Sequence, residues 1–438
     1  MKTAKKVLLI ILSILIVFSC KRYTEPEGSN VANEEENGNG LVDGGDNGDS
    51  ITANDTGPLS GSGGGTQVGN WTLPRNSLSQ EEQNQDYSPE DNYMVLFANG
   101  GIPALTTTST GVLVAAVGDY NGNIFVKRSL DSGYTWLTSQ LGAGANSRNP
   151  FFINCHNGDI LLGVTTYGAG STNTIFYRSS DNGASWTKEA NEIKVQDVDT
   201  TVTTNFVTYG QGITLRHGVN AGQNKLIFPY FYNTNDMALG QWTMTINSDD
   251  DGKNWIIGKN IKKSTGNPLG DYSSQETKLY EIEDGSILIN IRAGGNNMYW
   301  AKSTDYGSNW TFTTSGQQER ANSLHADLVR YEFNGKPIKG PKYGLMAYST
   351  QSGQYKVRLT DNDFNDGKPG IKYAHDYEIV MASGVTNGYP AITVLSDGTI
   401  GTLTEEASGS SANIIFRRFN LYWIANGQES VDYSTLAY

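Results

Sequence analysis

The chain has 438 residues, 37% of them hydrophobic, and a formal net charge of -13. This acidic balance argues against a nucleic-acid-binding protein, because phosphate binding depends on clustered Lys and Arg, and no such cluster follows the first residues. An acidic protein also gains no general attraction for anionic sugars, so a few well-placed cations have to hold any ligand of that kind.

The first 20 residues have the pattern of an export signal. Three lysines precede an apolar run over residues 7–18, which is too short to be a stable transmembrane anchor. The run ends before Cys20 in a sequence that resembles a bacterial lipobox, whose cysteine is lipidated and becomes the new N-terminus. Plain secretion with an incidental cysteine is the alternative. We therefore predict a lipoprotein signal at residues 1–20, lipidation of Cys20, and an exported chain anchored to the outer membrane or the cell surface.

Residues 21–80 are rich in Gly, Asn, Asp and Glu and hold few periodic apolar positions. Such a segment cannot bury enough surface to offset its chain entropy, so we predict a disordered, acidic linker. A tail that binds a partner is the other possibility.

Residues 81–438 consist of short apolar or alternating runs separated by Gly, Asn and Asp. This spacing, without long helical periodicity, is typical of many short antiparallel strands and predicts an all-β domain. Cys155 follows the apolar residues 151–153 and is expected to be a buried strand residue. The clearest runs cover residues 113–117, 160–164, 225–230, 286–291 and 414–419.

An eight-residue element of the form Ser-x-Asp-x-Gly-x-[Thr/Ser/Asn]-Trp occurs four times. In a tight hairpin the Asp accepts hydrogen bonds from turn amides, the Gly takes a positive φ, and the Trp packs back onto the sheet. We therefore assign these aspartates to turn architecture instead of catalysis. The copies begin at Ser129, Ser179, Ser248 and Ser303, and a degraded fifth copy lies near Thr360.

These repeats resemble the Asp boxes (BNR repeats) of the bacterial sialidase (neuraminidase) family, and the segments between them resemble that family too. The resemblance implies a six-bladed β-propeller over residues 81–438 and a retaining exo-α-sialidase that needs no metal or other cofactor. It also implies sialylated glycans or glycoproteins as partners, for a monomer that meets the membrane only through its lipid. The segments are residues 101–105, 149–150, 210–213, 276–292, 388–389, 395–401 and 418–423.

By this resemblance Tyr389 is the nucleophile, Glu276 its general base, and Asp119 the general acid. The substrate already carries a carboxylate beside the reacting carbon, so a neutral phenol that loses its proton as it attacks avoids charge repulsion. Each residue has a structural alternative. Tyr389 could be a packed strand-end aromatic, Glu276 a solvated strand charge, and Asp119 part of an ordinary turn.

The family binds the substrate carboxylate with three arginines, because a guanidinium matches a carboxylate in a bidentate manner. Arg292 corresponds to one of them, and Arg358 lies near the position of another. Gly101 stands where the first is expected, and Glu405 corresponds to the glutamate that supports that arginine. Loss of one clamp member commonly costs about 2 to 5 kcal/mol of binding.

Three functions therefore remain open. The first is an active exo-sialidase, and the second is a catalytically weakened, glycan-binding adhesin, which Gly101 motivates. The third is a propeller that binds protein only.

Overall fold

The protein is described from a computed structural model, in which the chain divides into two units, residues 1–50 and 51–438. The predicted signal, Cys20 and nearly all of the predicted linker lie outside the described residues. The structure describes residues 66–68, 88–90, 92–119, 122–139, 141, 147–168, 171–190, 193, 202–207, 209–234, 241–261, 269, 274–293, 297–312, 323–350, 353–364, 375–379, 386–408, 411–429 and 431.

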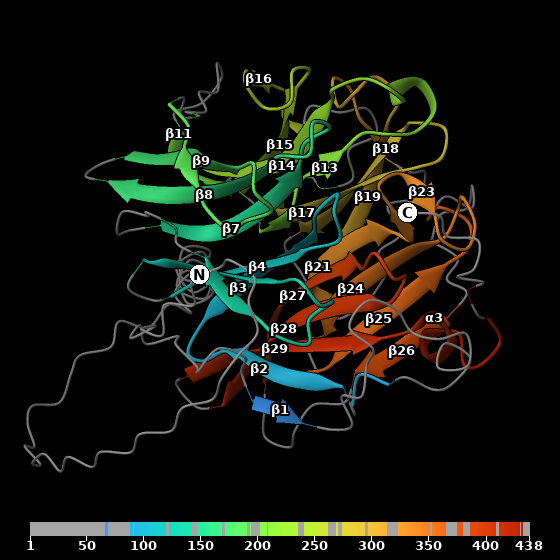
Figure 1. Ribbon diagram of the computed structural model, residues 1–438. Coiled ribbons are helices and arrows are strands. Elements are labelled where there is room, and N and C mark those ends of the chain that lie inside the picture. Colours follow the sequence, from blue (N-terminus) through green and yellow to red (C-terminus); the bar gives the residue numbers. More distant parts are fainter. Residues whose placement is uncertain are drawn as a thin grey trace, which may run out of the picture. The chain divides into compact units, whose positions relative to one another are not determined.

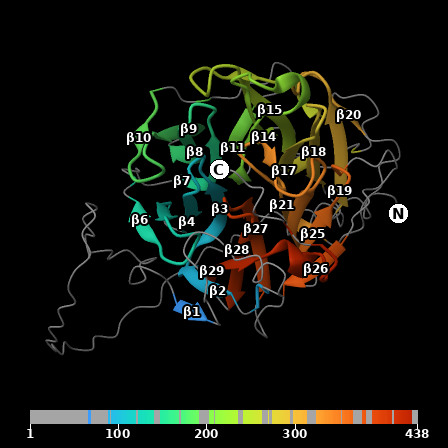
Figure 2. The same ribbon diagram turned by 45° about the vertical axis from the view of Figure 1, so that its right-hand side comes forward.

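The described residues from 66 to 431 form a six-bladed β-propeller, in which the main strands of each blade are antiparallel. Figure 2 shows the sheets arranged around a common centre, with β3, β7, β17, β21 and β27 on the inside. The first three blades follow the chain: β3 (Gly101–Thr107), β4 (Leu113–Gly118), β5 (Ile124–Ser129) and β6 (Leu137–Ser139); β7 (Ser147–Asn154), β8 (Ile160–Gly168), β9 (Ser171–Ser179) and β10 (Thr187–Lys188); and β11 (Val202–Val207), β14 (Leu226–Thr234), β15 (Gln241–Ser248) and β16 (Ile256–Ile257).

Two short strands connect the second and third blades. β12 (Gly210–Gln211) pairs parallel with β7, and β13 (Ile213–Thr214) pairs with β14; a 3-10 helix, η1 (Gly218–Asn220), follows. The next two blades are β17 (Ser274–Glu281), β18 (Ile287–Ala293), β19 (Asn297–Ser303) and β20 (Thr311–Phe312), then β21 (Ser323–Arg330), β24 (Gly344–Thr350), β25 (Tyr355–Thr360) and β26 (His375–Ile379), with the side hairpin β22 (Glu332–Phe333) and β23 (Lys336–Pro337).

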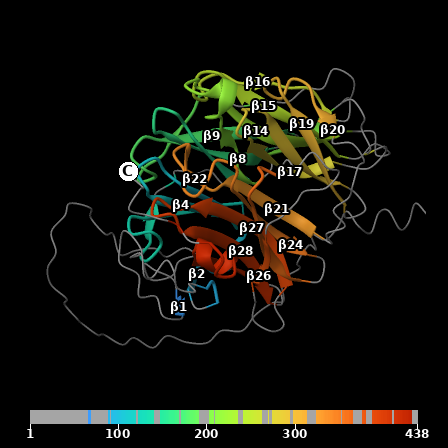
Figure 3. The same ribbon diagram turned by 90° about the vertical axis from the view of Figure 1, so that its right-hand side faces the viewer.

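The sixth blade joins the two ends of the described chain. β2 (Tyr93–Phe97) precedes the first blade in sequence but pairs with β29 (Ser411–Phe419), which continues to β28 (Ile400–Ser408) and β27 (Thr386–Val394). β1 (Thr66–Val68) pairs with β2 and extends this sheet, so the linker predicted at residues 21–80 is not wholly without regular structure. In Figure 1 these strands follow one another from β1 at the bottom up to β27, and Figure 3 shows β1, β2, β28 and β27 in the same order. A short helix, α3 (Leu421–Ile424), follows β29.

The apolar core is divided among the interfaces between blades. Each buried cluster among the described residues takes side chains from two neighbouring sheets, and together the clusters cover all six interfaces of the ring. One pairs Phe151 of β7 with Phe228 of β14, and another pairs Leu105 of β3 with Phe416 of β29. Each sheet therefore buries both faces against its neighbours, which stabilises the ring. No described helix is long and apolar enough to cross a membrane.

The strands expected from the sequence are present as β4, β8, β14, β18 and β29. Cys155 is buried as expected, but it lies in the turn after β7, so its assignment to a strand was wrong. Burial raises the pKa of the Cys155 thiol to about 12, which agrees with a residue that packs and does not act as a nucleophile.

The repeated element forms the turn that its sequence predicts. In the first copy the Asp131 carboxylate accepts hydrogen bonds from the Ser129 hydroxyl at 2.8 Å and from the Thr135 amide at 2.7 Å. Gly133 has a φ of 91°, and the indole of Trp136 donates to its carbonyl oxygen at 3.0 Å. The other three copies repeat the Ser–Asp contact, which confirms the structural assignment of these aspartates.

The degraded fifth copy is confirmed as well. The Thr360 hydroxyl donates to Asn362 Oδ1 at 2.6 Å, as the serine does to the aspartate in the complete copies. Asp363 has a φ of 62° and Phe364 a φ of 51°, so a phenylalanine holds the position that glycine holds elsewhere. The turn geometry therefore survives in the fifth blade without the consensus residues.

Candidate active site

Five inner strands share an irregularity near their first residues, and it positions the candidate site. In β17, β21 and β27 the pairing register shifts at a point that includes Glu276, His325 and Tyr389, respectively. The same shift occurs in β3 after Gly101 and in β7 after Arg148. A bulge of this kind redirects side chains, and bulges are common beside active sites. Five strands therefore present bulged residues at one end of the ring.

Tyr389 and Glu276 form the central contact of the site. The Tyr389 hydroxyl donates a hydrogen bond of 2.6 Å to Glu276 Oε1, between residues 113 positions apart in the sequence. The other carboxylate oxygen, Oε2, contacts Nη1 of Arg292 and lies 3.1 Å from Nδ1 of His325. One carboxylate thus connects a phenol, a guanidinium and an imidazole.

The electrostatics of this group keep the Glu276 carboxylate charged. Burial acts to raise the pKa of Glu276, but the positive charge of Arg292 and the contact with His325 outweigh it and hold this pKa well below its usual range. Burial lowers the pKa of His325, with Glu276 opposing that shift. Glu276 is therefore ionised at neutral pH, with His325 largely uncharged beside it.

Aromatic rings hold Tyr389 in place. The Tyr209 ring meets it edge-on with centroids 4.5 Å apart, and the His325 ring lies 3.8 Å away at an angle of 36°. Burial and the adjacent Glu276 raise the pKa of Tyr389 well above its usual value. The phenol is therefore neutral at rest.

A buried ion pair lies next to these groups. Lys278 and Asp327, both at most 2% exposed, lie 3.7 Å apart, and Lys278 also lies 3.6 Å from the centre of the Tyr209 ring. Asp327 accepts a hydrogen bond of 3.0 Å from the Ile392 amide of the sixth blade. Burial lowers the pKa of Lys278 to about 8 and raises that of Asp327. The pair joins three blades beneath Tyr389.

Glu405 lies beside Gly101, as the resemblance implies. A Cβ atom on Gly101 would be 3.6 Å from Glu405 Oε1, and the Ile102 amide donates to Glu405 Oε2 at 2.9 Å. Burial raises the pKa of Glu405, although the Ile102 and Tyr389 amides oppose that shift. Glu405 thus faces the point where the first arginine of the clamp would begin, and it binds backbone amides there.

Asp119 lies in a turn at the same end of the first blade. It directly follows Gly118, whose register partner is Gly101. Its Oδ1 accepts a hydrogen bond of 2.7 Å from the Asn123 amide, and its Oδ2 accepts one of 2.8 Å from the Asn123 side chain. The carboxylate therefore shapes this turn, and its role as a general acid stays a prediction.

Arg292 and Arg358 differ in their placement. Arg292 belongs to the site through its contact with Glu276. Arg358 lies on β25, the third strand outward in its blade, with its guanidinium 4.5 Å from the centre of the Tyr348 ring. The structure thus brings together Tyr389, Glu276 and Arg292, and sets Arg358 on a strand that does not line the centre.

Sequence reasoning missed His325, Tyr209, Lys278 and Asp327. Three of them had a signal in the sequence, because Glu276 and Lys278 are two positions apart on β17, and His325 and Asp327 are two apart on β21. Residues at i and i+2 face the same side of a strand, so charged pairs at this spacing on inner strands predict a polar centre.

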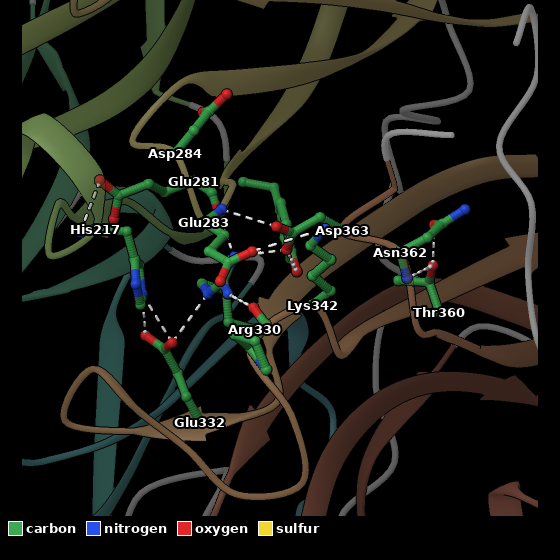
Figure 4. A network of polar contacts seen from close by, with 12 residues as sticks. His217, Glu281, Glu283, Asp284, Arg330, Glu332, Lys342, Thr360, Asn362 and Asp363 are labelled. Carbon is green, nitrogen blue, oxygen red and sulfur yellow. Dashed lines mark hydrogen bonds and ion pairs between the residues drawn. The ribbon is translucent and has the colours of Figure 1, made fainter. Parts of the chain in front are cut away.

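The opposite end of the inner strands holds a second polar group around a cavity of about 140 Å³. There the guanidinium of Arg330 donates to Glu332 at 2.9 Å and to Asp363 at 2.7 Å, and His217 lies 2.8 Å from Glu332 (Figure 4). Glu281 accepts the Arg216 amide at 2.7 Å. These ionic groups have partners on neighbouring strands, which indicates a structural network at this end.

Comparison with known proteins agrees with this architecture. Residues 123–332 match the BNR repeat-like domain. The chain is 25% identical over 370 residues to a sialidase from Micromonospora viridifaciens, covering 75% of this chain and 52% of that protein. It is 26% identical over 266 residues to an anhydrosialidase from Macrobdella decora, covering 59% of this chain and 32% of that protein.

The chain thus spans about half the length of the first of these relatives and a third of the second. Among solved structures, the intramolecular trans-sialidase from Ruminococcus gnavus matches with a TM-score of 0.55 and 16% identity, over 74% of this chain and 95% of that one. Residues 123–332 thus match a BNR repeat-like domain, and the chain is similar to sialidases in its sequence and in its six-bladed fold.

Proposed function

We propose that this chain is a retaining exo-α-sialidase that releases terminal sialic acid from glycans or glycoproteins. The observation that carries the proposal is the 2.6 Å hydrogen bond from the Tyr389 hydroxyl to Glu276. A tyrosine nucleophile with a carboxylate base is the arrangement that an anionic sugar substrate favours. The raised pKa of Tyr389 and the lowered pKa of Glu276 give the resting states that the proposal starts from, a neutral phenol beside a charged carboxylate.

The first chemical step forms a bond between Tyr389 Oη and the anomeric carbon. The hydroxyl proton moves to Glu276 Oε1, the glycosidic bond breaks, and the leaving oxygen takes a proton from an acid, for which we propose Asp119. In the second step water attacks the same carbon and gives a proton back to that acid. The bond to Tyr389 breaks, and Glu276 returns the proton to the phenol. Two displacements at one carbon retain its configuration.

Arg292 supplies part of the grip on the substrate carboxylate. Its guanidinium has five N–H donors, so it can hold Glu276 and still present donors to a second carboxylate. Burial and the Glu276 charge act in opposite directions on the pKa of Arg292, and the net shift is upward, so this group stays charged. From β25, Arg358 would act on the substrate carboxylate only through its charge, without direct contact.

The test is turnover of a fluorogenic sialoside by the chain, with Tyr389→Phe as the control. The substitution removes the attacking oxygen and keeps the ring that packs on Tyr209 and His325. We expect turnover by the wild type and a loss of at least about 1,000-fold in the variant, a range typical of removing a catalytic nucleophile. Equal rates in the two proteins would refute the proposal.

Analysis of the product distinguishes hydrolysis from an intramolecular transfer. Two relatives are named as an anhydrosialidase and an intramolecular trans-sialidase. In a transfer of that kind a hydroxyl of the same sugar replaces water in the second step, so the product is an anhydro sugar. Mass spectrometry separates the two, because the anhydro product is lighter by one water. Free sialic acid as the main product supports the hydrolase.

The second candidate is a glycan-binding adhesin with weakened catalysis, which Gly101 favours. The clamp lacks an arginine at this position, and Glu405 lies where the side chain of a residue at position 101 would begin. A glycan array with the folded Tyr389→Phe variant tests it: selective retention of sialylated glycans, together with no turnover by the wild type, would support the adhesin. Turnover by the wild type would exclude it.

We also propose that the domain is exported and held at the cell surface by lipid on Cys20. The apolar run that ends at Cys20 supports this location. Metabolic labelling with a fatty-acid analogue should mark the wild-type chain but not Cys20→Ser. Equal labelling of the two chains would refute lipidation at this residue.

A further inference from the structure

The first two blades begin with the same local structure, built on different residues. In β3 the sequence Gly101-Ile102-Pro103 precedes the end of the register shift at Ala104, and in β7 the sequence Arg148-Asn149-Pro150 precedes the end of the shift at Phe151. The middle residue has a positive φ in both, 54° at Ile102 and 52° at Asn149. Arg148 therefore holds, in the second blade, the position that Gly101 holds in the first.

The two positions lie next to each other across a pair of glycines. Gly101 is the register partner of Gly118. A Cβ atom on Gly118 would lie 3.9 Å from the Gly101 carbonyl oxygen and 4.0 Å from the Arg148 Cα. Neither glycine carries a side chain, so nothing from these two residues fills the space between Arg148 and Gly101.

Arg148 also lies on the rim that holds the candidate acid. The Ser147 amide donates a hydrogen bond of 2.6 Å to the Gly122 carbonyl, which ties the start of β7 to the loop after Asp119. Arg148 is exposed, whereas Arg292 is half-buried against Glu276. Arg148 is thus a solvent-exposed arginine on the rim that carries Asp119.

We propose that Arg148 supplies the guanidinium that Gly101 lacks and binds the substrate carboxylate together with Arg292. The inference rests on the proposed sialidase function and adds to it the residue that completes the anion site. The proposal requires the long Arg148 side chain to extend past Gly118 and Gly101 into the space that Glu405 faces. An arginine in the second blade thus takes the place of the one missing from the first, and the clamp has two guanidinium groups, those of Arg148 and Arg292.

The test measures kcat/KM on a fluorogenic sialoside for Arg148→Ala, Arg148→Lys and the double variant Gly101→Arg/Arg148→Ala. We expect Arg148→Ala to lose at least about 30-fold, mainly through KM. Arg148→Lys should recover part of the loss, because it keeps the charge without the planar fork. The double variant should regain at least tenfold over Arg148→Ala, since it returns the cation to the first blade. Arg128→Ala, on β5 of the first blade, is the matched control and should keep wild-type kinetics.

A binding arm separates failure of this inference from failure of the proposed function. The probes are an unsaturated sialic acid inhibitor and its uncharged methyl ester, titrated by calorimetry. Arg148→Ala should weaken the acid at least about 30-fold and the ester less than threefold. If the wild type turns over substrate and Arg148→Ala matches it, the role of Arg148 is refuted and the sialidase stands. If the wild type binds the acid through Arg148 without turnover, the anion site stands and the hydrolase falls. If the wild type does neither, both are refuted.

Discussion

The hydroxyl of Tyr389 donates directly to Glu276, at 2.6 Å, and the two residues lie on inner strands of different blades. The other oxygen of Glu276 faces Arg292 and His325, so the carboxylate is charged and oriented before substrate arrives. In this geometry the Oε1 atom of Glu276 faces the Tyr389 hydroxyl, and the Oε2 atom faces the two nitrogen groups.

Replacing Glu276 with Gln should therefore impair chemistry more than binding. The amide keeps the shape of the side chain but cannot take the phenolic proton, so we expect kcat to fall by about 10²- to 10⁴-fold, the usual contribution of a general base. Steady-state kinetics on the fluorogenic sialoside measures this. A higher KM with an unchanged kcat would show that Glu276 only positions the ligand.

Replacing His325 with Ala should change the pH dependence. His325 helps Arg292 to lower the pKa of Glu276, so its loss raises that pKa. Glu276 acts as a base only when ionised, and activity is lost as pH falls through its pKa. The acid limb of kcat/KM against pH should therefore move to higher pH in His325→Ala.

The control for the histidine is Tyr209→Phe, because it keeps the ring beside Tyr389 and adds no charge. It should leave the acid limb where the wild type has it. An acid limb that stays fixed in His325→Ala, or moves to lower pH, would contradict the role assigned to His325.

The sequence predicted the parts of this protein that depend on short-range chemistry. The Asp-box turns involve residues within eight positions, and their hydrogen bonds appear as the pattern required, even with Asn362 and Phe364 in the fifth copy. The resemblance to the family predicted Tyr389, Glu276 and Arg292, and the structure brings them together.

The sequence could not show which side chains meet from separate blades. His325 is 49 residues from Glu276, and their contact depends on bulges in two strands, β17 and β21, whose positions follow from sheet register. Cys155 was misplaced by one residue because burial continues past the end of β7. The sequence shows that Arg148 and Gly101 both stand two residues before a proline. That the two residues lie close together depends on how their blades pack.

The buried pair of Lys278 and Asp327 gives a prediction about stability. Removing one partner leaves an uncompensated buried charge, which typically costs about 3 to 5 kcal/mol. We expect that cost for Lys278→Met and for Asp327→Asn, measured by denaturant unfolding. The double variant should cost less than the two single changes added together, because neither charge remains. Strict additivity in this cycle would show that the two groups do not interact.

The Asp-box aspartates should affect folding without affecting catalysis. Asp131→Ala removes the acceptor for the Ser129 hydroxyl and for the amide and hydroxyl of Thr135, so we expect a loss of about 1 to 3 kcal/mol in the free energy of unfolding. Asp131→Asn should lose less, because Asn362 already serves as the acceptor in the fifth blade. In both variants kcat/KM of the folded protein should stay within threefold of the wild type, since the turn lies at the end of β5 and away from Tyr389. A large fall in kcat/KM with stability unchanged would show that Asp131 acts in the reaction after all.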